Sequence, residues 1–230
     1  MQRTAHPPRA RLRTILLLAA LAATAVGWAQ GGIADLEVTA YGRQRIDLAS
    51  GRTVLEDGGE LIERGSGVTL VAAWIAYAEG IEVTAREASI EGDVGHIEAP
   101  RVAIDLIAER LTASGGVAWR REGLRVTGET LWFDVDAGVV GLLGGVEASE
   151  PGASAVEAWI ELAGGRVLLV GPYAYADGPL VLRGGEGAGL QLDARQTDEG
   201  VVYDASTAID DDWRAAVATA RAAWAAASDE

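Results

Sequence analysis

One pattern recurs three times in this chain and limits the folds open to it. Segments 102–117, 131–146 and 158–173 align without gaps, at offsets of 29 and 27 residues. In each copy an acid follows an apolar residue, and a glycine stands ten residues after that acid. The acids are Asp105, Asp134 and Glu161, and the glycines are Gly115, Gly144 and Gly171. A period near this length is typical of elongated, stacked folds, in which each unit buries its apolar face against its neighbours.

The segment between residues 36 and 203 reads as short β-strands. Runs of alternating character, such as 102–106, 124–126 and 201–203, are separated by turns that contain glycine. The 30 glycines of the chain stand mostly singly or in pairs between apolar runs, as turn residues do. The predicted fold class is therefore all-β, built from stacked repeats of about 28 residues.

Alternation assigns two faces to the repeated strands, because successive side chains of a strand point to opposite sides. One face is apolar in every copy, and a degraded copy 29 residues upstream adds Ile75 to it. We expect a folded-over sheet with an apolar trough along its interior, of a kind that suits acyl chains. The candidate ligand-binding residues of this trough are Ile75, Val102, Ile104, Leu131, Phe133, Leu142, Ile160 and Leu169.

The opposite face carries a column of tryptophans. Trp132 and Trp159 occupy equivalent positions in two copies, and Trp74 falls in the same column upstream. Such a column indicates aromatic contacts across neighbouring strands. The alternative is that these rings line a ligand groove or the docking edge of a partner.

The tail has the composition of a helix. Three aspartates, 210–212, precede an Ala-rich segment that lacks Gly and Pro up to residue 227, which predicts a helix with an acidic N-terminal cap. Trp213, Val217 and Trp224 fall on one stripe at helical spacing. We expect this stripe to cap the open end of the sheet. The alternative is that these three residues dock a partner or lie at a membrane edge, and the scarcity of basic residues in this segment disfavours the membrane.

The first 29 residues read as a signal peptide. Four arginines (Arg3, Arg9, Arg11 and Arg13) precede the apolar stretch 15–26, and residues 27–29 form a small-x-small cleavage site. We expect a Sec-exported periplasmic protein whose mature chain comprises a β-domain over 30–205 and a helical tail over 206–230. An uncleaved membrane anchor beginning at Leu12 is the alternative.

Composition excludes several functions. The chain has 0 Cys, so neither disulfides nor thiolate metal sites are possible. The whole chain has 19 basic and 34 acidic residues, a net charge of -15. Without the four leader arginines, 15 basic residues remain against the same 34 acids, a net charge of -19. Such a surface repels nucleic acid and anionic membranes.

No catalytic constellation can be assembled, so we expect a protein without enzymatic activity, cofactor or metal. His96 is the single histidine outside the leader, and we expect it to be a solvated turn residue. Segment 134–138 (DVDAG) begins like a calcium loop but lacks its later acids, which favours a hairpin turn. Segment 184–189 (GGEGAG) lacks dinucleotide-binding spacing and reads as a loop.

The recurring unit, from an apolar-acid strand start to Gly-Gly-Val as in 133–146, resembles the OstA-like repeat. That repeat belongs to the periplasmic lipopolysaccharide-transport proteins LptA and LptC and to the N-terminal domain of LptD. The resemblance covers about residues 74–175, and the predicted cleaved leader is most similar to the soluble LptA member. It implies a β-jellyroll folded like a taco, whose interior carries the acyl chains of an amphipathic glycolipid.

The resemblance further implies partners and a role. Such domains stack edge to edge, with copies of themselves or with other jellyroll transport proteins, into a bridge for outer-membrane assembly that does no chemistry. The predicted function is therefore a lipid-transfer bridge for lipopolysaccharide or a related glycolipid. The alternatives are an LptC-like anchored component, a closed β-solenoid scaffold without ligand, and an exported hydrolase.

Overall fold

The computed structural model describes residues 36–121, 124–149, 151–197 and 200–228, and the predicted signal peptide lies outside these residues. The described part comprises sixteen strands and one helix. The elements are β1 (Leu36–Ala40), β2 (Gln44–Asp47), β3 (Arg52–Leu55), β4 (Gly59–Glu63), β5 (Thr69–Ala78), β6 (Glu82–Gly92), β7 (Gly95–Asp105), β8 (Arg110–Arg121), β9 (Leu124–Asp134), β10 (Val139–Ala148), β11 (Gly152–Glu161), β12 (Arg166–Val170), β13 (Tyr173–Asp177), β14 (Leu180–Gly184), β15 (Gly189–Thr197), β16 (Gly200–Ser206) and α2 (Asp211–Ser228).

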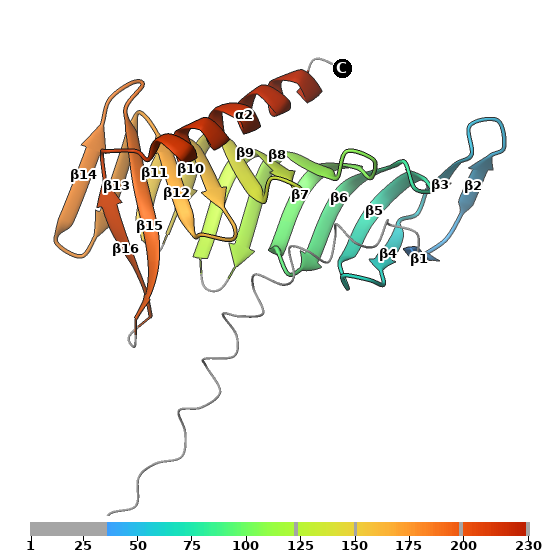
Figure 1. Cartoon of the computed structure of the whole chain (residues 1–230). Helices are drawn as coiled ribbons and strands as arrows, with labels where there is room; N and C mark the ends of the chain where they lie inside the picture. Colours follow the sequence, from blue (N-terminus) through green and yellow to red (C-terminus); the bar gives the residue numbers. More distant parts are fainter. Residues whose placement is uncertain (1–35, 122–123, 150, 198–199, 229–230) are drawn as a thin grey trace, which may run out of the picture.

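The strands form one continuous antiparallel sheet. From β5 to β12 each strand pairs with the strand that precedes it in the chain, β1 pairs with β4, and β15 and β16 extend the sheet beyond β12. Figure 1 shows the resulting elongated stack, with β1 and β2 at one end and β14 and β16 at the other. The predicted all-β class, a jellyroll of stacked repeats with a C-terminal helix, is confirmed.

The sheet is folded along its length into two arms. The long strands β5–β11 cross the fold and contribute one half to each arm. We call the arm that contains β2, β3, β12, β15 and β16 the helix-bearing arm, and the arm that contains β1, β4, β13 and β14 the bare arm. The halves of β11 show the division, since residues 157–160 pair with β12 and residues 152–154 pair with β13.

Bulges make the bends between the arms. In β8 the pairing register shifts between Ser114 and Val117, and in β10 a shift follows Leu143. Two glycines with positive φ occupy each shift: Gly115 and Gly116 in β8, and Gly144 and Gly145 in β10. Positive φ is readily adopted only by glycine, which explains why a glycine pair recurs in the repeated unit.

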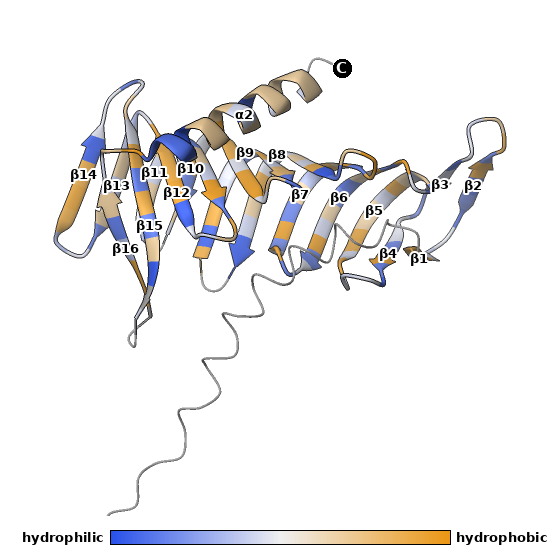
Figure 2. Cartoon of the chain, in the orientation of Figure 1, coloured by the Kyte–Doolittle hydropathy of each residue, from blue (hydrophilic) through white to orange (hydrophobic). Residues whose placement is uncertain are grey.

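The core lies between the two arms. Figure 2 shows hydrophobic and hydrophilic residues alternating along the strands, as expected for a sheet with one buried face. The helix-bearing arm contributes Val102, Leu131 and Ala158, and the bare arm contributes Ile97 and Trp119, all to one buried apolar cluster. The face that the sequence predicted as interior is therefore the interior.

Helix α2 lies across the outer face of the helix-bearing arm (Figure 1). Trp213 and Val217 of the helix pack against Trp132, Trp159 and Leu168 of the sheet. The expectation that the helix caps the open end of the sheet was wrong. The helical stripe instead packs on the outer face, where Trp132 and Trp159 supply an apolar surface for it.

Candidate functional site: an apolar cavity between the arms

The predicted trough residues lie on the inner face, where most of them are buried. Ile75 and Leu142 are 0% exposed and Leu131 is 1% exposed, while Val102, Phe133, Ile160 and Leu169 are also buried. Ile104 is partly buried against the same cluster. Side chains from both arms therefore fill the fold over most of its length.

Space remains in the half of the fold that lies toward the C-terminus. A cavity of about 40 Å³ lies between the arms, and its accessible lining is almost wholly apolar. Ile160, Val167 and Leu169 wall it from the helix-bearing arm, while Val126 and Val146 wall it from the bare arm. Of the predicted trough residues, Ile160 and Leu169 line this cavity.

A larger concavity, which we call the mouth, adjoins the cavity between the hairpin tips. This mouth has a volume of about 700 Å³, and its lining includes the tips 161–165 and 176–178. Five residues line both spaces and form the constriction between them: Leu124, Pro151, Ile160, Val167 and Tyr203. An apolar chain that reached the cavity from solvent through this mouth would pass these five residues.

Polar groups surround the mouth. Arg121 is the one basic residue among its described lining residues, and Glu161 and Asp177 are its acids. The Arg166 guanidinium holds Glu161 at 2.8 Å, which raises the pKa of Arg166. Tyr175 lies behind Asp177 with its ring buried, and burial together with the Asp177 carboxylate raises the pKa of Tyr175 to about 12. An apolar cavity behind a polar mouth fits an amphipathic ligand.

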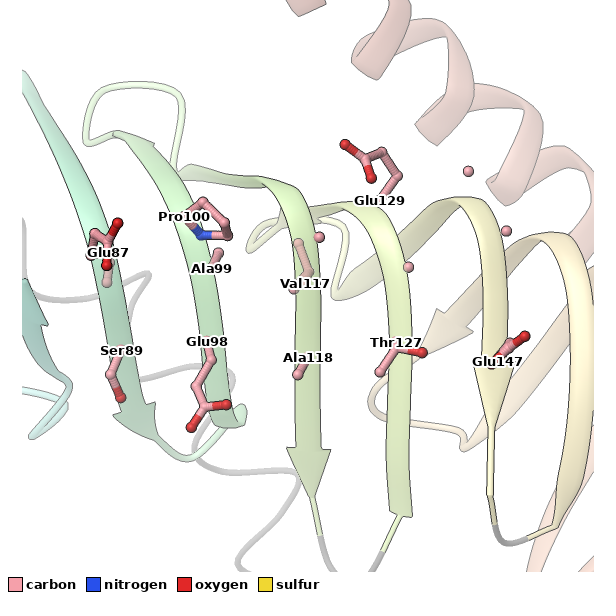
Figure 3. A pocket seen from close by; sticks show the side chains of 15 residues that line it. Glu87, Ser89, Glu98, Ala99, Pro100, Val117, Ala118, Thr127, Glu129 and Glu147 are labelled. Atoms are coloured by element: carbon pink, nitrogen blue, oxygen red, sulfur yellow. The ribbon is translucent and has the colours of Figure 1, made fainter.

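A second concavity, of about 790 Å³, crosses β6 to β10 at the line of bends (Figure 3). Glu87, Glu98, Glu129 and Glu147 line it, and none of its described lining residues is basic. Such a surface repels phosphate and carboxylate groups. It is therefore a poor site for the headgroup of an anionic lipid.

The predicted docking stripe is occupied by the chain's own sheet. Trp213 and Val217 are buried at the helix–sheet contact, and Trp224 packs at its margin. Two charged pairs support this contact: Arg166 with Asp212 at 2.8 Å and Arg221 with Glu157 at 2.7 Å. A partner could use this stripe only if the helix left the sheet.

The tryptophan column follows the predicted aromatic packing in part. The rings of Trp132 and Trp159 meet edge to face, with centroids 6.2 Å apart. They belong to β9 and β11, and Gly141 of the intervening strand β10 leaves room for the contact. Trp74 instead stacks under the guanidinium of Arg86, 4.6 Å from the ring centroid.

His96 is not the freely solvated residue that was expected. Its Nδ1 lies 2.6 Å from Glu91 and its Nε2 lies 3.0 Å from Glu98, at the start of β7. Both ring nitrogens thus face carboxylates, and the hydrogen bonds to Glu98 and Glu91 raise the pKa of His96. This arrangement is a cross-strand ion cluster and contains no nucleophile.

The two motif-like segments form turns. Segment 134–138 is the β9–β10 turn, in which Asp134 accepts hydrogen bonds from the backbone N–H of Ala137 and from Arg110. Segment 184–189 joins β14 to β15. No group of three acids or histidines suited to a metal ion occurs in the described part of the chain. Over the same residues, no helix is long and apolar enough to cross a membrane.

The sequence interpretation missed four residues of the constriction, and one of them, Val167, lies within the third repeat. Leu124, Pro151 and Tyr203 lie outside the three repeats, two of them near hairpin ends and one on the edge strand β16. Alternation in segments 124–126 and 201–203 marks Leu124 and Tyr203 as facing one side, but it does not bring the two segments together. That proximity depends on the folding of the two arms.

Together these features define a class: a folded-over β-sheet protein with an apolar cavity that adjoins a concavity between its hairpin tips. No protein-family model matches the sequence, and no curated protein matches it either. Among solved structures, the chain is similar to the crystal structure of LptH, the LptA homologous periplasmic component of the lipopolysaccharide transport device from Pseudomonas aeruginosa. The superposition has a TM-score of 0.44 and 16% sequence identity, and it covers 48% of this chain and 82% of that chain.

Proposed function

We propose that this protein is a periplasmic, non-enzymatic carrier that holds the acyl chains of lipopolysaccharide or a related glycolipid during outer-membrane assembly. The observation that carries the proposal is the apolar cavity behind the polar mouth. Each methylene moved from water to an apolar site contributes about 0.8 kcal/mol, so a carrier of this kind needs an apolar interior with access from solvent. The OstA-like pattern of the repeats supports the same proposal.

The partners proposed with this function would meet the free edges of the sheet. At one end β14 and β16 expose Leu180, Val181 and Val201, and at the other end Ile46 of β2 is exposed. Unpaired strand edges are templates for pairing with another sheet. Copies of this chain, or other transport domains with such edges, could extend the apolar interior from one protein to the next.

Photo-crosslinking tests the proposal. A photo-reactive amino acid at Ile160 would cross-link purified lipopolysaccharide, because this side chain lines both the cavity and the mouth. The same residue placed at Ile107, an exposed position between β7 and β8, is the matched control. A second probe at Phe133 reports how far the lipid reaches. Absence of lipid adducts from both inner positions in the folded protein would contradict the proposal.

A structural scaffold without ligand is the second candidate. The observation in its favour is the filled core from β5 to β9, where Ile75, Ile90 and Leu131 are at most 1% exposed. A scaffold would keep its stability and its cross-links unchanged in the presence of lipid. A rise in melting temperature on addition of lipopolysaccharide would separate the carrier from the scaffold, since a ligand that binds the folded state stabilises it.

The anchored alternative concerns residues 1–29, which lie outside the described part of the chain. Mass spectrometry of the protein after export tests it directly. A mature chain that begins at Gln30 fits a soluble, LptA-like carrier, whereas an intact leader fits an LptC-like membrane-anchored component.

A further inference from the structure

The two halves of the fold differ in access to the interior. Toward the N-terminus, Ile75, Ile90 and Ile97 are at most 2% exposed and lie in the filled core. Toward the C-terminus, the constriction separates the mouth from the cavity. A cavity of about 40 Å³ has room for about three water molecules, at about 10–15 Å³ for each, which is far less than an acyl chain occupies. An acyl chain can therefore enter only if one wall of the cavity moves.

Trp119 stands where the filled half meets the mouth. Its side chain is 2% exposed and belongs to the filled core, yet the residue also lines the mouth. The indole N–H donates to the carbonyl of Val94 at 2.7 Å, which fixes the ring in place. Because this large ring is held at the boundary, it obstructs passage from the mouth toward β5 and β6.

The helix-bearing arm is supported from behind at the cavity. Trp159 and Leu168 face α2 on the outer side, and their chain neighbours Ile160 and Val167 face the cavity on the inner side. Arg166 links the same arm to Asp212 of the helix. This wall is therefore held by a second layer of packing.

The bare arm lacks such support over the cavity. In the described part of the chain, the packed apolar cluster of α2 includes sheet residues of the helix-bearing arm alone. The strands β8 and β10, which lead to the bare-arm side of the mouth, bend at the glycine pairs Gly115–Gly116 and Gly144–Gly145. The first glycine of each pair lies against a neighbouring strand, whereas a Cβ added at Gly116 or Gly145 would meet nothing within 4 Å, so each bend is packed on one side and open on the other.

We propose that the bare arm over the cavity is a movable wall, through which a single aliphatic chain of an anionic amphiphile enters sideways from the mouth. The chain passes between Leu124 and Pro151 on the bare arm and Val167 and Tyr203 on the helix-bearing arm. Its acidic end stays in the mouth beside Arg121, while Trp119 keeps it out of the filled half. This inference rests on the proposed function and adds the route, the gating residues and the ligand class.

The route is tested with the unmodified protein and palmitic acid that carries a diazirine. After illumination, mass spectrometry locates the adducts. We expect adducts on β9, β11, β12 and β16, and none on β3, β5 or β6. Adducts spread evenly into the segment 75–97 would overturn the lateral route while leaving the carrier function intact. No adduct anywhere in the interior would instead count against the carrier function, and with it the route.

The movable wall is tested by joining the two arms. Because the chain has 0 Cys, the pair Pro151→Cys and Val167→Cys can be joined specifically with a short bismaleimide. Joining should abolish adducts in the cavity, while the same variant left unjoined retains them. The control pair Arg195→Cys and Val202→Cys lies on adjacent strands of the helix-bearing arm, outside the lining of the cavity and the mouth, and should retain adducts when joined. Unchanged uptake by the protein with joined arms would overturn the proposal.

The role of Trp119 has its own variant. Trp119→Leu removes the ring and its hydrogen bond to Val94, so adducts should extend from the mouth to residues near Ile97. A labelling pattern identical to that of the unmodified protein would show that Trp119 does not bound the site.

Discussion

At the scale of single residues, position 141 must be glycine because the ring of Trp159 lies against it. A Cβ at this position would lie 2.7 Å from the Trp159 ring, well inside van der Waals contact. Gly141→Ala should therefore destabilise the fold by about 1–3 kcal/mol, as overpacked core sites do. Urea denaturation measures the change. Gly152→Ala is the matched control, because its Cβ would have its nearest neighbour at 3.7 Å; equal losses in the two variants would contradict the prediction.

His96 predicts a dependence of stability on pH. Its pKa is raised in the folded protein by Glu98 and Glu91, above the usual value near 6.5. Its stabilising contribution is therefore complete below the unfolded pKa and is lost as the pH rises through the folded pKa. The melting temperature of the unmodified protein should fall more than that of His96→Gln between pH 6 and pH 8. An NMR titration that gave His96 a pKa below 6.5 would contradict this account.

The sequence predicts which face of the sheet a residue occupies, but not whether that residue borders the cavity or is packed in the filled core. Alternation placed Ile160 and Leu169 on the inner face, and both line the cavity. It placed Ile75 and Leu131 on the same face, but these two are buried in the filled core. The difference depends on which side chains of the bare arm lie opposite, and a repeat pattern within one arm carries no information about them.

At the scale of elements, the helix–sheet contact depends on Trp213. The ring is 0% exposed and packs with Trp132 and Trp159. Trp213→Ala should cost about 3–5 kcal/mol of the free energy that holds α2 to the sheet. Circular dichroism during heating measures the effect: in Trp213→Ala the helix signal should be lost at a lower temperature than the sheet signal. Thr219→Ala, on the exposed side of α2, is the control and should leave the helix transition in place.

The helix itself was predictable, but its position was not. The Ala-rich composition and the stripe of Trp213, Val217 and Trp224 predict an amphipathic helix from sequence alone. The stripe fits any apolar surface of matching width, whether at the end of the sheet or on its outer face. The aspartates at the start of the helix were predicted to cap it, but two of them also bind residues of the sheet. Asp212 forms an ion pair with Arg166, and Asp210 accepts a hydrogen bond from the side chain of Gln191.

At the scale of the whole molecule, the open edges predict self-association. Val181 on β14 and Val201 on β16 are 58% and 50% exposed at one end of the stack. Sedimentation velocity should show association that increases with protein concentration, and Val181→Lys with Val201→Lys should weaken it, because charges on edge strands oppose pairing. Ile107→Lys, at an exposed hairpin tip, should leave association unchanged. If Ile107→Lys weakened association as much as the double variant does, association would not depend on the strand edges.

The period near 28 residues was sufficient to predict a stacked sheet, because units with a shared apolar face can bury it only against one another. The division into two arms also follows from the glycine pairs, since a bulge with positive φ bends a strand. The branching at the C-terminal end was not predictable: β11 passes to β12 in one arm and to β13 in the other. Local patterns do not determine which of two free edges a later strand joins.

The order of the strands has a consequence for how the molecule is made. From β5 to β12 each strand pairs with its immediate predecessor, so this part of the sheet can grow one strand at a time. A chain that emerges end-first, from a ribosome or a translocation channel, would have the template for each of these strands in place before the strand arrives. Contacts this local in sequence favour rapid folding. Helix α2 is synthesised last. When it packs on the sheet it buries Trp132 and Trp159, which would otherwise remain an exposed apolar patch prone to aggregation.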